Sequence, residues 1–575
     1  MTKGRPAPAA VRRWNGWGLV GTEYPVPPGA ARFLAGRITA HVIAGKGDDT
    51  ESRRSPLDES GAPLPEPDHD QVARAIPPSR LPWHPAVSTD PSLRLSHALG
   101  QSLPDWIRLR AGQIPVAPDG VAFPTDDEEV RGLLAYAREA GAAVIPYGGG
   151  TSVVGQLEIA RDLGRPVLSV DTGKMEALHS LDATGHLATF GAGAKGPDIE
   201  AELGGRGFTL GHFPQSFELS SIGGWVATRS AGQESLLYGR IEDLFAGGRV
   251  ETPAGTLVLP ATPASAAGPD LRQLVLGSEG RLGVLTEAVV RIRPAPTVNM
   301  YGAAFFPDFD SGLAALREIA QGGGGGGAGG GRGGGIGGGS LCLLRLDSAE
   351  ETATTLALAG HGRLIRQYER WLAWRGATQG KCLLIFGAAG GRRPVRRTMG
   401  EVFDACRAHR AVGAVTLLAR EWVKNRFRTP YLRNTLWEMG YAVDTLETAV
   451  TWSKVGSLLS HLEVTLSHAL ADKGEGVHAF AHISHVYRDG ANIYVTYIFR
   501  RGWSPAESLR RWKTVKEAAC RIIVEAGGTI SHQHGVGLDH KAYLAAEKGE
   551  LGLAALRGAL GVFDPAGMMN PGKLV

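Results

Sequence analysis

The chain has 575 residues, of which 43% are hydrophobic and 21% charged, values typical of soluble globular proteins. This length predicts two to four domains with a large core. A formal net charge of +4, with no basic run interleaved with aromatic residues, argues against nucleic-acid binding. Four widely spaced cysteines argue against a disulfide framework or a zinc site and favour a reducing, cytoplasmic location.

The first 104 residues give few structural signals. Residues 1–15 are charged and lack the apolar region of a secretory signal. The sequence has no run of about 18 apolar residues, so no membrane-spanning helix is predicted. Residues 45–80 are rich in Pro, Asp, Glu, Ser and Arg without periodicity. Such a composition predicts an exposed, irregular linker.

Between residues 105 and 295, strand-like and helix-like segments alternate, which favours an α/β or α+β domain. Residues 126–141 predict a helix, because Thr125 or Asp126 can cap it, acidic residues fill its first turn and apolar residues recur at helical spacing. Short apolar runs predict three strands, at residues 142–145, 166–171 and 186–190.

A glycine motif at residues 191–196, Gly-Ala-Gly-Ala-Lys-Gly, matches the GxGxxG pattern of nicotinamide-binding folds. However, Pro197 begins only a short helix, which Gly204 and Gly205 end. No clean βαβ unit with a ribose-binding acid follows, so we do not assign a nicotinamide cofactor to this motif.

The second half contains an unusual insertion. Residues 322–339 are almost pure glycine, whose large conformational entropy predicts a flexible surface loop between a helix at 312–319 and a strand at 341–346. Amphipathic and alternating patterns then predict two helical segments and one strand, at residues 351–373, 455–472 and 493–500.

A glycine-rich loop follows the predicted strand at 142–145. Residues 146–153 are Pro-Tyr-Gly-Gly-Gly-Thr-Ser-Val. Because glycine has no Cβ, this backbone can approach a ligand closely, and its exposed N–H groups form an anion site to which Thr151 and Ser152 add hydroxyls. The loop suits a pyrophosphate, with a purely structural turn as the alternative.

Two later blocks, at residues 220–230 and 277–287, also combine glycines with hydroxyl and charged side chains. Each block alone could be a structural turn. Three of them between residues 146 and 287 predict several backbone approaches to one long ligand that carries a diphosphate, a ribityl chain and a ring.

Together the three blocks resemble the FAD-binding domain of the vanillyl-alcohol-oxidase/PCMH family, and within it the branch of alkyldihydroxyacetonephosphate synthases. Further segments that are similar to this branch are Arg13-Trp-Asn-Gly-Trp-Gly18, Gly211-His212, Tyr238-Gly-Arg-Ile-Glu-Asp243, Tyr431-Leu-Arg433, Ile493-Tyr494 and Ser531-His-Gln-His-Gly-Val-Gly537.

The resemblance implies an α+β fold, with a PCMH-type two-subdomain FAD-binding domain and an α+β cap domain. It implies an N-terminal arm and irregular linker at 1–104, the FAD-binding domain at 105–295 and the cap or substrate domain at 296–530, with its insertion at 322–339. Residues 531–575 are expected to return to the flavin site.

The implied cofactor is FAD. Non-covalent binding is expected, because some relatives attach their flavin to a histidine of the first loop and no histidine lies in residues 146–153. The implied contacts are Pro146, Tyr147, Gly148, Gly149, Gly150, Thr151, Ser152, Gln215 (Asp in the synthases), Ser216, Phe217, Glu218, Leu219, Ser220, Ser221, Thr228, Arg229, Ser230, Ala231, Glu279, Gly280, Arg281, Leu282, Gly283, Val284 and Leu285.

The implied reaction replaces the acyl group of acyl-dihydroxyacetone phosphate with a long-chain alcohol, in ether-lipid synthesis. It proceeds through the flavin N5 without net redox change. An FAD-dependent dehydrogenase or oxidase of a 2-hydroxy acid or related alcohol stays open, because it shares the flavin loops, and so does a non-enzymatic flavin-binding protein. The expected partner is a lipid or other small molecule; peripheral membrane contact and a homodimer are left open.

By resemblance, Tyr494, His532, His534 and Arg345 are catalytic, and Arg433 and His212 bind substrate. The alternating strand places Tyr494 and Thr496 on one face. A phenol titrates near pH 10, so it needs a nearby cation to act as a base at neutral pH; the alternative is a core tyrosine.

The histidine and arginine candidates also have structural alternatives. His532 and His534 are two residues apart and face one side if the segment is extended; the synthases carry a third histidine where this chain has Gln533. A metal pair is the alternative, although no third ligand is identifiable. Arg345, in an apolar strand, needs Asp347 or another carboxylate as a partner, and the fork of Arg433 suits a phosphate.

Overall fold

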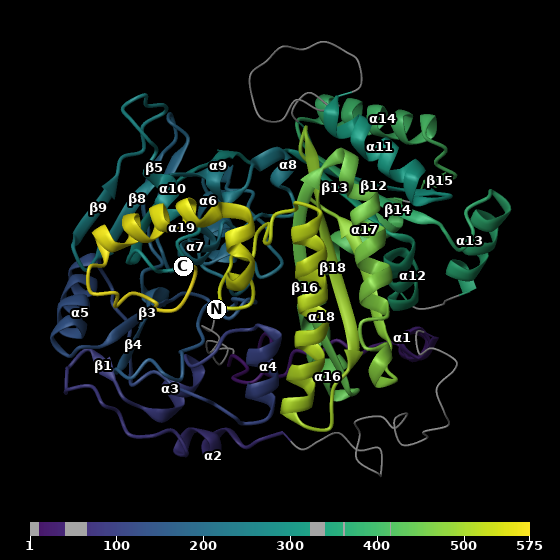
Figure 1. Cartoon of the computed structure of the whole chain (residues 1–575). Helices are drawn as coiled ribbons and strands as arrows, with labels where there is room; N and C mark the ends of the chain where they lie inside the picture. Colours follow the sequence, from purple (N-terminus) through teal and green to yellow (C-terminus); the bar gives the residue numbers. More distant parts are fainter. Residues whose placement is uncertain (1–10, 41–65, 323–339, 360–362, 415) are drawn as a thin grey trace, which may run out of the picture.

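The computed structural model describes residues 11–40, 66–322, 340–359, 363–414 and 416–575. In Figure 1, the sheets and short helices of the first half lie beside one large sheet of the second half, which is flanked by long helices. Helices and mostly antiparallel sheets are thus combined in one chain, and the predicted α+β class is confirmed. The domain boundaries at residues 104, 295 and 530 stay a prediction.

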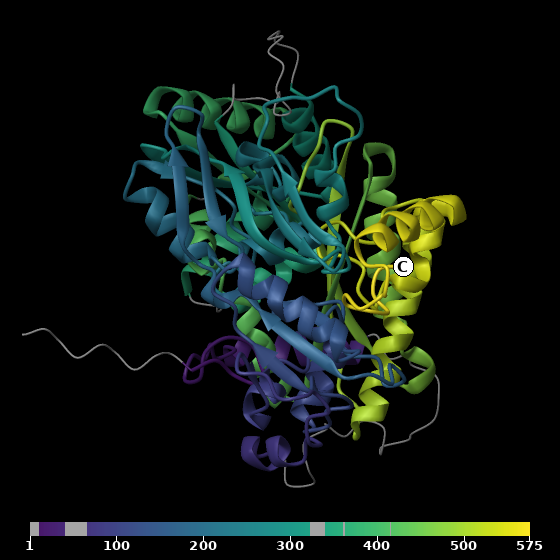
Figure 2. The ribbon, with the colours of Figure 1, turned by 90° about the vertical axis from the view of Figure 1, so that its left-hand side faces the viewer.

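The first half forms two main sheets, with the five-stranded sheet above the four-stranded sheet in Figure 2. The four-stranded sheet has the order β1 (Val87–Ser88), β2 (Gly120–Ala122), β4 (Val167–Asp171), β3 (Ala143–Tyr147). The five-stranded antiparallel sheet has the order β5 (Leu178–Asp182), β6 (Leu187–Gly191), β10 (Val284–Arg291), β8 (Phe245–Thr252), β9 (Gly255–Leu259). A two-stranded ribbon joins β7 (Phe208–Thr209) to β11 (Arg293–Pro294).

Local sequence signals account for much of this half. Helix α5 (Asp127–Glu139) begins after Asp126, whose carboxylate accepts a hydrogen bond from the Glu129 N–H, and it buries four apolar residues at helical spacing. The predicted strands are confirmed as β3, β4 and β6. The GxGxxG motif leads into the short helix α6 (Gly196–Gly204), as expected.

The predicted linker is partly wrong. Residues 66–80 belong to its described part, and they include helix α2 (His69–Arg74). Asp68 caps this helix by accepting a hydrogen bond from the Gln71 N–H at 2.7 Å. A six-residue helix with one buried residue, Ala73, produces no apolar periodicity, so composition alone concealed it.

The second half is built on a seven-stranded antiparallel sheet. Its order is β15 (Gly413–Ala414), β12 (Val298–Phe306), β14 (Cys382–Gly390), β13 (Leu341–Asp347), β17 (Val477–Ile483), β18 (Gly490–Arg500), β16 (Tyr441–Thr451). Helices α11 (Phe309–Gln321), α14 (Arg392–Ala408) and α17 (Trp452–Ser467) pack on one face and form the largest apolar core with it. Part of the opposite face is covered by α12 (Ala349–Leu358), α13 (Arg363–Trp374) and α15 (Thr416–Asn425).

Predictions for this half hold except for one interrupted helical segment and one helix end. Helix α11 and strand β13 flank the glycine-rich insertion, and the strand predicted at 493–500 is β18. The segment predicted as helical at 351–373 is instead two helices, α12 and α13, and α17 ends at Ser467 rather than continuing to residue 472. Residues 323–339 lie outside the described residues.

The C-terminal segment crosses back to the first half. Helix α19 (Leu544–Phe563), yellow in Figure 1, ends with the Phe563 carbonyl accepting a hydrogen bond from the Ala254 N–H. Beyond it, Met569 pairs with Val144 of β3 in a parallel bridge. Residues far apart in sequence therefore complete the first half of the structure.

The remaining elements are further helices and short 3-10 turns. They are α1 (Pro28–Ala40), α3 (Pro91–Ser96), α4 (Leu103–Arg110), α7 (Ile222–Thr228), α8 (Ser235–Tyr238), α9 (Ile241–Leu244), α10 (Arg272–Val275), α16 (Leu432–Glu438) and α18 (Pro505–Glu525), with 3-10 turns η2 (Thr172–Lys174), η3 (Thr429–Tyr431), η4 (Ala471–Lys473) and η5 (Lys541–Tyr543).

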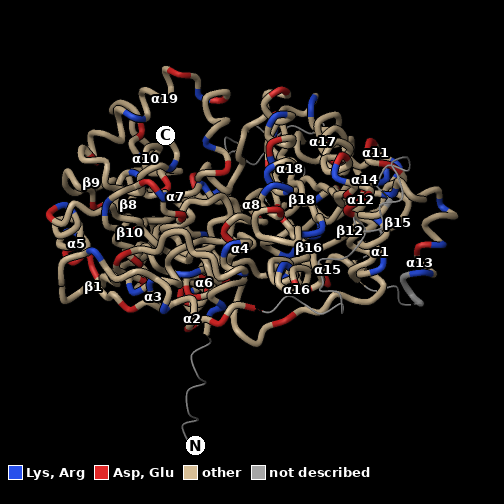
Figure 3. The backbone as a smooth tube through the Cα atoms, turned by 60° about the horizontal axis from the view of Figure 1, so that its bottom comes forward, with Lys and Arg blue, Asp and Glu red and all other residues tan. Residues whose placement is uncertain are grey.

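Charges are distributed over the whole molecule. Figure 3 shows basic and acidic residues interspersed in both halves. Within the described ranges, no helix is both long and apolar enough to cross a membrane. The four cysteines are buried thiols.

Candidate active site

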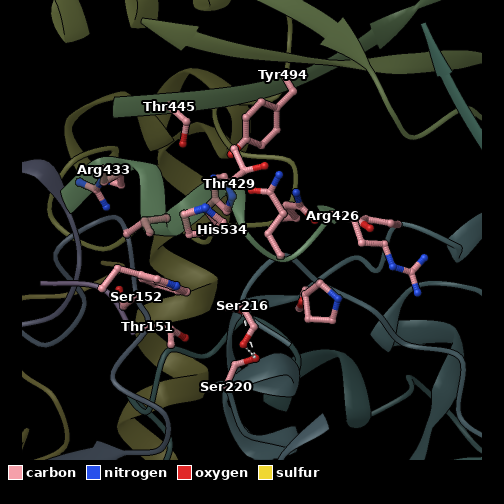
Figure 4. Close-up of a pocket in the computed structure, with 18 of the residues that line it drawn as sticks. Thr151, Ser152, Ser216, Ser220, Arg426, Thr429, Arg433, Thr445, Tyr494 and His534 are labelled. Atoms are coloured by element: carbon pink, nitrogen blue, oxygen red, sulfur yellow. Dashed lines mark hydrogen bonds between the residues drawn. The ribbon is translucent and has the colours of Figure 1, made fainter. Parts of the chain in front are cut away.

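A cavity of about 710 Å³ lies between the glycine-rich loops of the first half and one face of the seven-stranded sheet. Figure 4 shows hydroxyl side chains of the loops on one side, the sheet on the other and His534 between them. Labelled from the loops are Thr151, Ser152, Ser216 and Ser220, and from the sheet Thr445 and Tyr494. A ligand in this cavity therefore contacts both halves of the chain.

The glycine loop is shaped by its contacts with the second block. A Cβ built on Gly149 would lie 2.1 Å from the Leu219 carbonyl oxygen and 2.7 Å from Ser220 Cα, and one on Gly148 would lie 2.3 Å from Ser221 Oγ. Because those distances are shorter than any van der Waals contact, only glycine allows the two backbones to meet here. Together they form a cradle of main chain and hydroxyls that fits a pyrophosphate.

The third block is held by the C-terminal segment. Glu279 takes a left-handed conformation with φ of 53°, and its carboxylate accepts hydrogen bonds from the N–H groups of Val536 and Gly537. The Asn570 side chain donates to the carbonyls of Glu279 and Gln156. The loop at 279–285 thus depends on residues almost 300 positions later in the sequence.

Most predicted FAD contacts line this cavity. They are Pro146, Tyr147, Gly148, Gly149, Gly150, Thr151, Ser152, Gln215, Ser216, Ser220, Ser221, Thr228, Ser230, Glu279, Gly280, Leu282, Gly283, Val284 and Leu285. Six others lie outside its lining: Phe217, Glu218, Leu219, Arg229, Ala231 and Arg281.

Several of these outlying residues support the loops from behind. Arg281 donates to the Met569 carbonyl at 2.6 Å, and Arg229 donates to the Leu276 carbonyl at 3.2 Å. Arg229 also takes a left-handed conformation, where it ends α7. These arginines tie the binding loops to neighbouring segments.

Tyr494 stands on β18 at the centre of the cavity-facing surface. It is opposite Glu447 on β16 and His482 on β17, and its ring stacks on His482 with centroids 4.8 Å apart. Tyr494 and Thr496 both line the cavity, as the alternating pattern predicted, while Val495 points into the core. Burial raises the pKa of Tyr494, with Glu447 adding to the rise and a hydrogen bond with Thr445 opposing it.

The two predicted histidines do not face the same way. Residues 532–534 form bends rather than an extended segment, so the alternation argument fails. His534 lines the main cavity with its ring nearly perpendicular to that of Tyr494, whereas His532 lines a second cavity of about 610 Å³. Gln533, between them, lines both cavities.

Glu447 joins the two histidines. His532 Nδ1 lies 2.9 Å from Glu447 Oε1, and its Nε2 lies 2.6 Å from the Tyr487 hydroxyl. His534 Nε2 is 4.0 Å from Glu447 Oε2. Burial raises the pKa of Glu447, but His532 and His534 together with His485 lower it more, so the net shift is downward. Glu447 is therefore an ionised carboxylate.

Arg345 lines the cavity and has the partner that its apolar strand required. Its Nε donates to Asp347 at 2.8 Å, and its Nη2 donates to Glu351. Burial lowers the pKa of Arg345, but the two carboxylates raise it more. Its positive charge is therefore largely compensated within the protein.

Arg433, unlike Arg345, has no carboxylate partner among the described residues. Its guanidinium lies 4.3 Å from the Trp106 ring centroid, its Nη1 donates to the Gln101 carbonyl at 2.8 Å, and its buried Nη2 has no hydrogen-bond partner. Burial lowers its pKa, with Asp444 opposing the shift. Among the described residues, Arg433 forms no ion pair, so its charge and its Nη2 remain available at the cavity for an anion.

His212 does not lie in the cavity lining. Its ring packs on Trp225 at 4.7 Å, and Nε2 is 3.2 Å from Ser230 Oγ. Burial, assisted by Arg240, lowers its pKa to about 3, so the imidazole is neutral. His212 contacts the second flavin block and reaches the cavity only through Ser230 and Trp225.

Two clusters of buried groups have spacings that could hold a metal ion. Glu447, His485 and His532 offer ligand atoms within 4.8 Å of one another, as do Asp347, Glu351 and His482. Both ring nitrogens of His532 already have hydrogen-bond partners, and the second cluster is held by Arg345. The hydrogen bonds account for both clusters without a metal.

Several residues at the site were not predicted. Arg12 donates to the Gly149 carbonyl, Gln156 donates to the His534 carbonyl, and Arg426, paired with Glu234, lines the cavity. Their sequence context carried no signal. Glu447 did carry one, because a carboxylate within a strand such as β16 must find partners when it is buried.

Comparison with known proteins gives the family. Residues 118–259 match the FAD binding domain, and residues 345–574 match the C-terminal domain of FAD linked oxidases. An alkyldihydroxyacetonephosphate synthase of Dictyostelium discoideum is 31% identical over 496 residues, which cover 85% of this chain and 78% of that protein. The predicted cofactor, FAD, is confirmed.

Comparison with solved structures supports the same family and fold. An alkyldihydroxyacetonephosphate synthase structure superposes with a TM-score of 0.76 and 26% identity, covering 98% of this chain and 99% of that one. A p-cresol methylhydroxylase structure, at 14% identity and a TM-score of 0.63 over 88% of this chain and 96% of that one, shows the same fold and confirms the PCMH type. The chain belongs to the alkyldihydroxyacetonephosphate synthase family of FAD-binding proteins.

Proposed function

We propose that the chain is an FAD-dependent alkyldihydroxyacetonephosphate synthase, which replaces the acyl group of acyl-dihydroxyacetone phosphate with a long-chain alcohol. The observation that carries this proposal is the convergence of Tyr494, His534 and Arg433 on the cavity that also holds the glycine loop. Family membership supports it, because the relatives named above are synthases of this type.

The cavity offers both kinds of surface that such substrates need. Arg433, whose Nη2 has no hydrogen-bond partner, suits the phosphate of the substrate. Apolar side chains from both halves suit the hydrocarbon chain, and they include Trp17, Phe33, Leu34, Leu356, Leu436, Phe480 and Ile498. A phosphate site that adjoins an apolar wall favours a phosphorylated lipid over a small 2-hydroxy acid.

Bound FAD supplies an electron sink for the substrate carbon that exchanges its substituent. The residues supply proton transfer and positioning. Because its pKa is raised, Tyr494 is protonated at neutral pH and starts as a proton donor. Arg345 and Arg433 both interact electrostatically with the Tyr494 phenol, and their positive charges stabilise the phenolate that forms when it donates its proton.

The roles of the other predicted residues follow from their positions. We infer that His534 exchanges protons with the substrate beside Tyr494 and that Arg345 orients the centre through its carboxylate partners. His532 and His212 do not line this cavity and support their neighbours. Non-covalent FAD, peripheral membrane contact, a homodimer and a cytoplasmic location stay predictions.

The proposal is tested by incubating the FAD-loaded protein with acyl-dihydroxyacetone phosphate and hexadecanol without an electron acceptor. Ether product and free fatty acid should form in equal amounts while the flavin stays oxidised. Absence of ether product, together with bleaching of the flavin by D-lactate or another 2-hydroxy acid, would establish a dehydrogenase instead.

The substitution Tyr494→Phe tests the role of the phenol hydroxyl. Turnover of this variant should fall by at least about 100-fold, the usual contribution of a proton-transferring group, while FAD stays bound. Tyr136→Phe is the matched control, because that hydroxyl donates only to the Pro82 carbonyl, away from the cavity. Near-normal turnover of Tyr494→Phe would remove the phenol from the mechanism.

A further inference from the structure

The carboxylate of Glu447 is unevenly satisfied. Oε1 is engaged by His532 and by the Asn492 side-chain amide, which is itself fixed because its oxygen accepts hydrogen bonds from the N–H groups of Ser484 and His485. Oε2 is buried and has no hydrogen-bond partner. A carboxylate kept only for stability would be expected to have both oxygens satisfied, because an unpaired buried oxygen is costly.

The unpaired oxygen faces the cavity histidine. Oε2 lies 4.0 Å from His534 Nε2, which is too far for a hydrogen bond but close enough for strong electrostatic attraction. The rings of His534 and Tyr494 are nearly perpendicular, at 81°, with centroids 5.9 Å apart. A shift of about 1 Å would close the hydrogen bond to Glu447 when His534 takes up a proton.

The other partner cannot make such a shift. His532 is held at both ring nitrogens, by Glu447 and by Tyr487, and its carbonyl accepts a hydrogen bond from Arg240 at 2.7 Å. His532 therefore fixes the position of the carboxylate, while His534 is the imidazole whose protonation the carboxylate can change.

We propose that Glu447 is a positioning residue of the reaction, whose fixed negative charge allows His534 to take up a proton beside Tyr494. The inference rests on the proposed function and adds to it the group that keeps a buried histidine basic. Without that charge, a buried imidazole is driven to its neutral form.

The electrostatic surroundings agree with this role. Burial lowers the pKa of His534, and Glu447 is the largest influence that raises it. The titratable groups around the pair are His482, His485, His532 and Tyr494 near Glu447, and Lys516 of α18, Asp444 of β16, His532 and His540 near His534. Lys516 and His532 oppose protonation of His534 and Asp444 favours it, and the influence of each is smaller than that of Glu447.

A first experiment needs no substrate. In the full chain labelled with 15N-histidine, the ring nitrogens of His534, assigned by their loss in His534→Gln, are followed by NMR as pH changes. Glu447→Gln should move the His534 midpoint to lower pH by about one unit or more, as expected for loss of an opposite charge at this distance. An unchanged midpoint in a folded variant would overturn the proposal, whatever the reaction of the protein.

Glu463→Gln controls for exchanging a buried glutamate beside this sheet. Glu463 is hydrogen-bonded to the Ser348 hydroxyl and the Ala481 N–H, and it does not line the cavity. Burial raises its pKa to about 8, so it is mostly the neutral acid at neutral pH and its replacement removes little charge. Its replacement should leave the His534 midpoint unchanged. If Glu447→Gln does not fold, Glu447→Asp is measured instead. It moves the carboxylate away from His534 by the length of one methylene, so the His534 midpoint should move in the same direction by a smaller amount.

A second experiment connects the charge to turnover. Because protonated His534 becomes rarer in Glu447→Gln, the limb of kcat against pH that falls as His534 loses its proton should move to lower pH, while FAD content stays normal. Glu447→Asp should restore part of the profile. A uniform loss of kcat at every pH, without a shift, would assign Glu447 a purely structural role and refute the proposal.

Discussion

Replacing Gly149 with alanine adds one methyl group at the contact between the first two flavin-binding loops. The new Cβ would lie 2.1 Å from the Leu219 carbonyl oxygen and 2.7 Å from Ser220 Cα. Both neighbours are main-chain atoms, so no side-chain rotation relieves the overlap, and the two loops must separate.

The size of the effect follows from the cost of overpacking. Forcing extra methyl groups into well-packed sites costs about 1–3 kcal/mol, and the main-chain overlap here places Gly149→Ala at the upper end. If that cost falls on the closed form of the loops, FAD binds about 10- to 100-fold more weakly, since about 1.4 kcal/mol corresponds to a tenfold change. The dissociation constant is measured by titrating the deflavinated protein and following flavin fluorescence.

Gly132→Ala provides the control for this substitution. Gly132 lies on α5 with no atom within 4 Å of the added Cβ, and alanine favours a helix over glycine by about 1 kcal/mol. This variant should bind FAD normally and be slightly more stable. Equal FAD affinity of Gly149→Ala and the unaltered protein would refute the assignment of this loop contact to the cofactor site.

Three further predictions concern the charged side chains Arg433 and Asp105 and the expected absence of a bound metal. Arg433→Lys keeps the positive charge but loses the planar fork. The KM for acyl-dihydroxyacetone phosphate should rise about 10- to 100-fold, because a charged hydrogen bond contributes about 1.5–3 kcal/mol, and the FAD content should stay unchanged. An unaltered KM would contradict a phosphate contact. Burial, reinforced by Glu158, raises the pKa of Asp105 to about 6. The native protein therefore loses stability as pH rises from about 4 to 6, because the buried acid then ionises. The melting temperature of Asp105→Asn, relative to that of the unaltered protein, should increase over this window and then level off. A difference that does not vary with pH would contradict this. Dialysis against EDTA should leave turnover unchanged, because hydrogen bonds already occupy both ring nitrogens of His532; loss of turnover that zinc restores would indicate a metal site instead.

Local signals predicted the elements that local chemistry determines. Helix α5 has a capping aspartate, an acidic first turn and a regular apolar face, and each is visible in the sequence. The alternation of β18 likewise placed Tyr494 and Thr496 on one face. These features depend on residues close together in the chain, so the sequence is sufficient to predict them.

Features that depend on distant residues were not predictable in the same way. The pairing of Glu447 with Tyr494 is a matter of strand register, and the sequence specifies neither the partner strand nor its alignment. The bends at 532–534 invalidate an argument that assumes an extended chain, and they direct His532 to a different cavity from His534. Arg345 was expected to pair with Asp347 or another carboxylate, and it pairs with Asp347 and with Glu351 of α12; the sequence did not specify that second partner.

The hydrogen bonds from the C-terminal segment to the flavin loops have a consequence for biosynthesis. Glu279 is held by Val536 and Gly537, and Met569 pairs with Val144. While the chain is being translated, the loops at 146–152 and 279–285 emerge from the ribosome long before these partners do. The contacts that hold these loops can therefore form only after the residues beyond 531 have been synthesised.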